Sequence, residues 1–142
     1  MTRSKRLEPI ARVADRHEQD AAGRFAESRE SLVQQRQRLE EMRSYREEYL
    51  GRLAKQGGGG LRASQIKEYQ VFLARLDDTI GQLEGMVHAA ERAMEQRRNE
   101  WLGRRARSKA LDGVVDRYRR EEDRDSLRRE ERESDERNQR RS

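Results

Sequence analysis

The sequence has no cysteine, one proline, one tryptophan and two phenylalanines among its 142 residues. The lack of cysteine excludes disulfide bonds and thiolate metal sites, and it is typical of proteins from reducing compartments. The longest unbroken apolar run covers only residues 71–74, whereas a helix needs roughly 20 apolar residues to span a bilayer. We therefore expect a soluble, cytoplasmic protein that does not insert directly into a membrane.

Apolar residues are also scarce. They make up 32% of the chain, and charged residues make up 43%. This is too little apolar surface for a globular core, but it is enough for one narrow seam between helices, and such compositions are typical of coiled coils. The net charge of +5 comes from interspersed signs, which favours a solvated coiled-coil surface over a nucleic-acid-binding face.

The most regular pattern runs from Ile66 to Tyr118, where apolar residues recur in alternating steps of three and four. This repeat predicts a helix that buries a narrow seam against another helix and supercoils left-handed. Arg97 and Arg104 interrupt the seam, and we expect their stems to pack while their charges stay in water. The seam positions are Ile66, Tyr69, Leu73, Leu76, Ile80, Leu83, Val87, Ala90, Met94, Arg97, Trp101, Arg104, Ser108, Leu111, Val115 and Tyr118.

An earlier stretch, from Leu7 to Leu53, carries a similar but more polar seam. Proline is tolerated in the first turn of a helix because its missing N–H needs no partner there, so we expect the first helix to begin near Pro9. Two consecutive steps of four, from His17 to Phe25, form a stutter, which predicts local unwinding of the supercoil.

Four glycines separate the two seams: Gly57, Gly58, Gly59 and Gly60. They stop a helix and permit a chain reversal, whereas a phosphate-binding loop would need a preceding strand and a Gly-Lys-Ser/Thr ending. Ser64 is a good N-cap for the second helix. We expect a single coiled-coil domain over 1–142, with helix one at about 7–55, a hinge at about 56–63 and helix two at about 64–130. Beyond helix two we expect a charged extension that is frayed or disordered.

The two seams match when the chain is folded back at the glycines. In an antiparallel hairpin, the residue numbers of facing positions add up to a nearly constant total. Tyr49 then faces Tyr69, and His17 faces Trp101. The sequence therefore predicts an all-α fold, a long antiparallel two-helix coiled-coil hairpin that is monomeric alone, although a swapped dimer would give the same pairs.

Residues that carry chemistry are sparse. The two histidines, His17 and His88, lie far apart, and we expect His17 to be a packed seam residue. A two-helix rod has no concave pocket that could exclude water or shift the pKa of a carboxylate. We therefore expect no enzyme activity, no metal and no cofactor.

Two features remain as candidate binding surfaces. Phe72 lies beside the seam; it either widens the seam or belongs to a strip for a partner, because interfaces favour aromatic residues. A basic stretch is either a solvated face or a site for an acidic protein surface or a phosphate backbone. That stretch contains Arg97, Arg98, Arg104, Arg105, Arg107 and Lys109.

Several stretches resemble the FliJ family, small coiled-coil proteins of the bacterial flagellar export apparatus. They are LEPI at 7–10, YREEY at 45–49, QIKEYQVFLARL at 65–76, and the stretch from Trp101 to Tyr118. The resemblance covers essentially the whole chain, and Tyr-Gln-x-Phe-Leu at 69–73 is its most distinctive part. The four glycines depart from the family pattern.

The resemblance implies a non-enzymatic component of flagellar type III protein export with a fold similar to the central stalk of rotary ATPases. The open end, formed by both termini, would enter the export ATPase hexamer and promote its assembly. The flank would contact the cytoplasmic domain of the export gate, and the protein would also escort export chaperones. This places the protein in the cytoplasm, peripheral to the inner membrane at the flagellar base, with a role in flagellum biogenesis and chemotaxis.

The implied sites are spread along the hairpin. Phe72, Leu76 and Leu83 would lie where a gate could reach them. Arg97, Arg104 and Arg105 would meet the rim of the ATPase pore, and Tyr118 would begin the tip. The alternatives are a homologous stalk protein of an injectisome, or a general coiled-coil scaffold or dimerisation protein.

Overall fold

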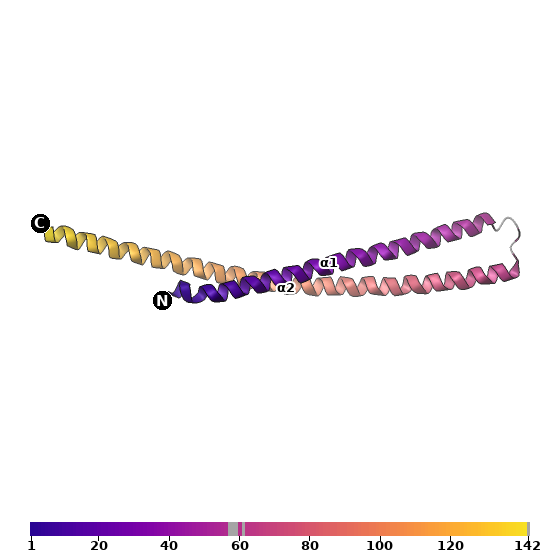
Figure 1. The fold of residues 1–142 in the computed structure, drawn as a ribbon, viewed down its shortest axis with the longest axis horizontal. Helices are drawn as coiled ribbons and strands as arrows, with labels where there is room; N and C mark the ends of the chain where they lie inside the picture. Colours follow the sequence, from indigo (N-terminus) through magenta and orange to yellow (C-terminus); the bar gives the residue numbers. More distant parts are fainter. Residues whose placement is uncertain (57–59, 61, 142) are drawn as a thin grey trace. The chain divides into compact units, whose positions relative to one another are not determined.

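The computed structural model describes residues 1–56, 60 and 62–141, almost all of them in two helices. These are α1 (Arg3–Gln56) and α2 (Ala63–Arg141). They pack against each other as a hairpin, and the described residues include no strand (Figure 1). The predicted all-α antiparallel hairpin is confirmed.

Helix α1 begins at Arg3, earlier than expected. Thr2 caps it, because the Arg6 backbone N–H donates to the Thr2 carbonyl at 3.2 Å and the Lys5 N–H reaches the Thr2 hydroxyl at 3.4 Å. Pro9 therefore lies inside the helix and not in its first turn, so the expected start was wrong. A proline at this position removes one backbone hydrogen bond from the helix.

Helix α2 begins at Ala63, and its cap differs from the prediction. The Gln65 side chain accepts a hydrogen bond from the Arg62 N–H at 3.1 Å, and the Arg62 carbonyl accepts from Gln65 and Ile66. Ser64 thus lies in the first turn and is not the N-cap. Of the predicted hinge glycines, Gly60 has a φ of 76°, a conformation that suits glycine; Gly57, Gly58 and Gly59 lie outside the described residues.

Helix α2 continues to Arg141, well past the expected end near residue 130. No glycine or proline follows Gly113 in the sequence, so nothing in this stretch breaks a helix. Arginine and glutamate are good helix formers, and pairs such as Glu133–Arg137, at 4.0 Å, add about 0.2–0.5 kcal/mol each. The charged extension is therefore helical over its described residues, and the expectation of fraying was wrong.

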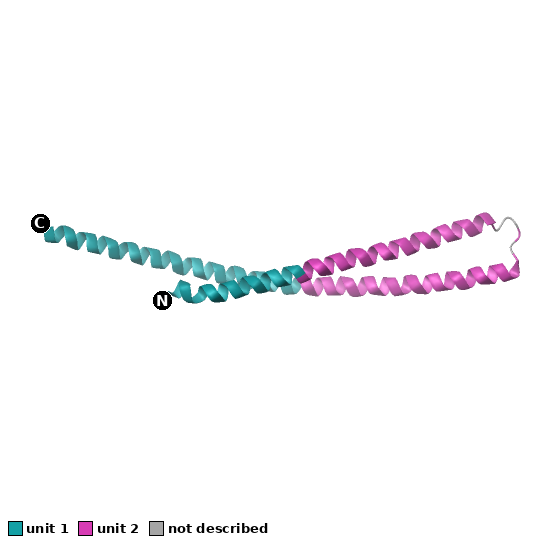
Figure 2. Ribbon diagram, viewed as in Figure 1, with its two compact units in different colours: residues 1–23, 99–142 teal, residues 24–98 magenta. Residues whose placement is uncertain are grey.

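The hairpin divides into two compact units, each of which contains a segment of both helices (Figure 2). Unit 1 is Met1–Gly23 with Asn99–Ser142, and unit 2 is Arg24–Arg98. The core of unit 2 is made of large aliphatic side chains, and burial of each stabilises the hairpin by about 1.5–3 kcal/mol. These buried residues are Leu32, Leu39, Ile80 and Val87, with Met42, Leu83, Ala90 and Met94 packed against them.

The seam of unit 1 is built differently, from small side chains on α1. Ala11, Ala14 and Ala21 are buried there, and Val115 and Ser108 are the buried residues of α2. Small side chains bury little apolar area, so hydrophobic burial contributes less in this unit. Ala11 was not among the predicted seam positions.

The predicted pair of His17 and Trp101 was wrong. His17 is exposed, and the indole N–H of Trp101 donates to the Glu18 carboxylate at 2.8 Å. The buried and half-buried positions of α1 here include 11, 14, 18, 21, 25, 28 and 32, which alternate steps of three and four without interruption. The predicted stutter was therefore wrong, and the seam position is Glu18 and not His17.

Candidate partner-binding surfaces

Four aromatic side chains gather near the glycine turn of unit 2. The Phe72 ring lies 4.6 Å from the Tyr49 ring and 6.4 Å from the Tyr45 ring, and Tyr49 also packs edge-on against Tyr69 at 5.8 Å. The Tyr69 hydroxyl donates to the Gln56 side chain at 3.2 Å. Burial of the Tyr49 hydroxyl is the largest cause that raises its pKa, and the electrostatic effect of the nearby Tyr69 is the second. Phe72 thus packs within the hairpin and is half-buried.

The two leucines predicted beside Phe72 belong to the packed seam. Leu76 is only 6% exposed, and Leu83 is half-buried against the core of unit 2. Both side chains hold α1 to α2, so little of either is available to a second protein.

The exposed apolar surface beside Phe72 belongs instead to Val71, which is 51% exposed. Val71 and Phe72 line a shallow groove of about 530 Å³, and the groove's walls also include Lys67, Glu68 and Arg75. An exposed apolar strip with a charged rim has the chemistry of a protein interface. The sequence singled out Phe72, but the structure gives Val71 the more accessible side chain.

The predicted basic stretch falls on both units. Arg97 and Arg98 belong to unit 2, and Arg104 and Arg105 to unit 1; all four are exposed. The Arg105 guanidinium lies over the Trp101 ring at 5.4 Å, a cation–π contact. In unit 1 this stacks an arginine on an indole that is itself fixed by Glu18.

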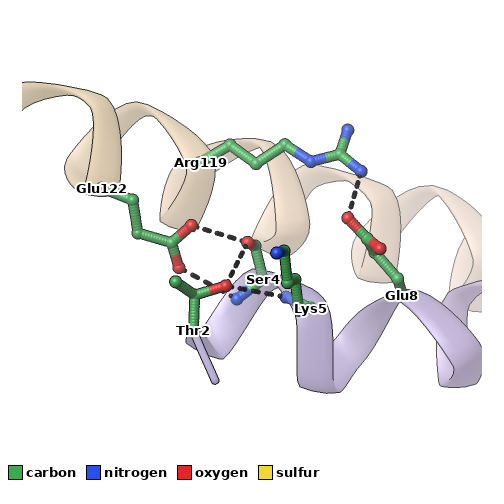
Figure 3. A network of polar contacts seen from close by, with 6 residues as sticks. All are labelled: Thr2, Ser4, Lys5, Glu8, Arg119 and Glu122. Carbon is green, nitrogen blue, oxygen red and sulfur yellow. Dashed lines mark hydrogen bonds and ion pairs between the residues drawn. The ribbon is translucent and has the colours of Figure 1, made fainter. Parts of the chain in front are cut away.

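A polar network that the sequence did not predict joins the start of α1 to α2 in unit 1 (Figure 3). Ser4, which is 3% exposed, donates to Glu122 from its backbone N–H at 3.1 Å and from its hydroxyl at 2.6 Å. Glu8 and Arg119 form an ion pair at 2.6 Å. We refer to the Ser4–Glu122 and Glu8–Arg119 contacts as the terminal clamp.

The terminal clamp shifts the pKa values of its own members. The hydroxyl and backbone N–H of Ser4 hold the Glu122 pKa below its ordinary value of 4.5. The hydrogen bond and charge of Glu8 raise the pKa of Arg119. Beside the clamp, the Arg3 guanidinium lies 5.6 Å from the centre of the Tyr118 ring, so the predicted tip residue Tyr118 is half-buried.

The described residues include no group of three or more histidines and carboxylates that could hold a metal ion. None of the described helices combines the length and apolar character that crossing a membrane requires.

Comparison with known proteins agrees with this architecture. The profile of one family, described as the flagellar FliJ protein, matches residues 3–142. No curated protein and no solved structure matches the chain. Because the family match covers nearly the whole length of a helical hairpin, the chain belongs to the FliJ family of flagellar proteins.

Proposed function

We propose that this protein is the stalk of the flagellar export ATPase. In this proposal the end that carries both termini enters the pore of the ATPase hexamer and promotes its assembly. The other end contacts the cytoplasmic domain of the export gate, which couples the two machines, and the protein also escorts export chaperones. It works in the cytoplasm, peripheral to the inner membrane at the flagellar base.

Membership of the family supports the general part of this proposal. The FliJ family takes part in flagellar export and is a non-catalytic component of it. The stalk, assembly and escort roles go further: the geometry of unit 1 supports the stalk and assembly roles, and the escort role rests on the family resemblance alone.

The C-terminal part of α2 is the observation that carries the proposal. Beyond Glu122, which meets the start of α1, the helix continues to Arg141 with its described side chains exposed. Within unit 1, Figure 2 shows this part of α2 extending past the N-terminus of α1. A single helix is about 10–12 Å across, which is narrow enough to enter a ring. Leu127, 59% exposed, is a large apolar side chain that could contact the pore lining.

Truncation after Asp125 tests the role of this tip. The truncated chain keeps Glu122 and therefore the terminal clamp, so we expect unchanged helix pairing. We expect it to lose most of its stimulation of hexamer assembly and ATP turnover when it is mixed with the purified flagellar export ATPase. Leu127→Ser should lower stimulation in part, and Val33→Ser, an exposed valine of unit 2, is the matched control. Full stimulation by the truncated chain would contradict the tip assignment.

The groove at Val71 is the proposed contact with the gate. Val71→Ser removes exposed apolar area without touching the seam, so it should weaken binding to the purified gate domain by about tenfold and leave helicity unchanged. Phe72→Ala should lower both binding and thermal stability, because Phe72 also packs on Tyr49. Calorimetry measures binding, and circular dichroism measures helicity and thermal stability. If the Val71→Ser variant bound the gate domain with wild-type affinity, the groove at Val71 would not be the contact with the gate.

The alternative of a scaffold that dimerises predicts a doubled mass. Light scattering of the purified chain distinguishes it from the stalk, which should be monomeric until the ATPase is added. The injectisome alternative predicts stimulation of an injectisome ATPase at least equal to that of the flagellar enzyme.

A further inference from the structure

Two of the cross-helix ion pairs of unit 2 are related by one heptad and form a ladder, whereas the pair between Arg46 and Asp77, at 2.6 Å, lies outside it. Arg43 pairs with Glu84 at 3.2 Å, and Arg36 pairs with Glu91 at 3.3 Å. From the first pair to the second, α1 moves back by one heptad and α2 moves forward by one. Both pairs therefore lie on the same flank of the antiparallel seam, with the arginine on α1 and the glutamate on α2.

The next step of this ladder is a mismatch. One heptad further, the same register places Arg29 of α1 opposite Arg98 of α2, so an arginine stands where the ladder requires a glutamate. The Arg29 guanidinium lies over the ring of Phe25, its own neighbour on α1, at 5.4 Å. Arg98 approaches Glu95 of its own helix at 3.8 Å, a long contact between exposed side chains. Neither arginine has a described cross-helix ion pair of the kind that Arg36 and Arg43 make.

We propose that Arg29 and Arg98 form a cationic notch that receives a carboxylate side chain from an acidic segment of a protein partner. Two guanidinium groups on opposite helices can both donate to one carboxylate, and such charge-assisted bonds are strong and directional. The partner's carboxylate would occupy the place of the missing glutamate and complete the ladder across the two helices.

The rest of the flank favours a protein over a nucleic acid. Glu91 and Glu84 occupy the next two positions of α2 on this flank, and a phosphate backbone running along it would meet their charges. A nucleic-acid site would instead present a continuous stripe of one sign. A carboxylate on a folded protein can enter at a single position.

Two binding probes test this inference. The first is the export ATPase, and its use rests on the proposed function. The second probe is a soluble polyglutamate peptide, which does not depend on that function. A double-stranded oligonucleotide is included as the competing class of anion.

The test uses Arg29→Glu and Arg98→Glu in the full chain. Each variant can form the missing cross-helix pair, so each should unfold at a temperature about 2 °C above that of the wild type. Each should also bind both the polyglutamate peptide and the export ATPase at least about tenfold more weakly at physiological salt. Arg38→Glu makes the same charge change elsewhere on unit 2 and should keep both affinities within about twofold.

The outcomes are distinguishable. If the wild type binds polyglutamate through these arginines but not the ATPase, the proposed function fails and the notch stands. If the wild type binds the ATPase and the two variants bind it equally well, the notch is wrong and the proposed function stands. Binding to neither probe overturns both. Tighter binding of the oligonucleotide through the same arginines overturns the assignment to a protein partner.

Discussion

Gln35 carries a polar atom that the hairpin does not satisfy. It occupies a seam position of α1 between Leu32 and Leu39, and its side-chain oxygen is buried without a hydrogen-bond partner in the described structure. A buried and unpaired acceptor costs about 1–3 kcal/mol. Gln35 therefore destabilises unit 2, whose core is otherwise aliphatic.

Replacement of this side chain should therefore stabilise the protein. We expect Gln35→Leu to raise the free energy of unfolding by about 1–2 kcal/mol, because it removes the unpaired acceptor and adds apolar burial. Urea denaturation followed by circular dichroism measures the change. Gln34→Leu, at the exposed neighbouring position, is the control and should change stability by less than about 0.5 kcal/mol. Equal effects of the two variants would show that Gln35 finds a partner in solution.

At the scale of the element, the glycines of the helices and of the turn have opposite roles. A Cβ atom added at Gly81 or Gly85 would meet no atom within 4 Å, and both residues are exposed in α2. Gly60, in the turn, has a φ of 76°, which disfavours any residue with a side chain.

Alanine substitutions should therefore change stability in opposite directions. Gly81→Ala and Gly85→Ala should each stabilise the protein by up to about 1 kcal/mol, since alanine is the better helix former and nothing obstructs its methyl group. Gly60→Ala should destabilise it by about 1 kcal/mol. Thermal unfolding of the three single variants gives the comparison. A loss of stability in both helical variants would indicate that these glycines accommodate a bend.

Periodicity in the sequence predicted the pairing of the helices where side chains are large. The contact between Tyr49 and Tyr69 and the shared core of Leu32 and Val87 follow from the 3.5-residue repeat. The prediction failed near His17, because alanines and the charged Glu18 occupy the seam positions there and no large apolar side chain marks them. The repeat carried no information about the terminal clamp, because hydrogen bonds such as those between Ser4 and Glu122 depend on side-chain conformations and not on apolar spacing.

At the scale of the whole molecule, different forces stabilise the helix pairing inside each of the two units. Unit 2 has a continuous aliphatic core with ion pairs along its flank. Unit 1 has a seam of alanines, a buried serine and the terminal clamp, so much of its cohesion is polar. Polar contacts at a surface respond to pH and salt, whereas aliphatic packing hardly does. The helix pairing of unit 1, the unit proposed to enter the ATPase, should therefore be more sensitive to pH and salt than that of unit 2.

This difference predicts that acid loosens unit 1 first. The Glu122 pKa is lower in the folded protein than its ordinary value of 4.5, so the bonds from Ser4 contribute their full stability above that value. The contribution is lost as the pH falls below 4.5 and the carboxylate becomes protonated. Hydrogen exchange at pH 3 should therefore show reduced protection at the start of α1, after correction for the intrinsic exchange rate, while the core of unit 2 around Leu39 keeps its protection.

Glu122→Gln provides the test at neutral pH. The neutral amide removes the charge that Ser4 recognises, so the variant should show a local loss of protection at Ser4 already at pH 7. The core around Leu39 should be unaffected in both proteins. If acid reduced protection evenly over both units, or if the variant kept wild-type protection at Ser4, the Ser4–Glu122 contact would not be what holds the start of α1 against α2.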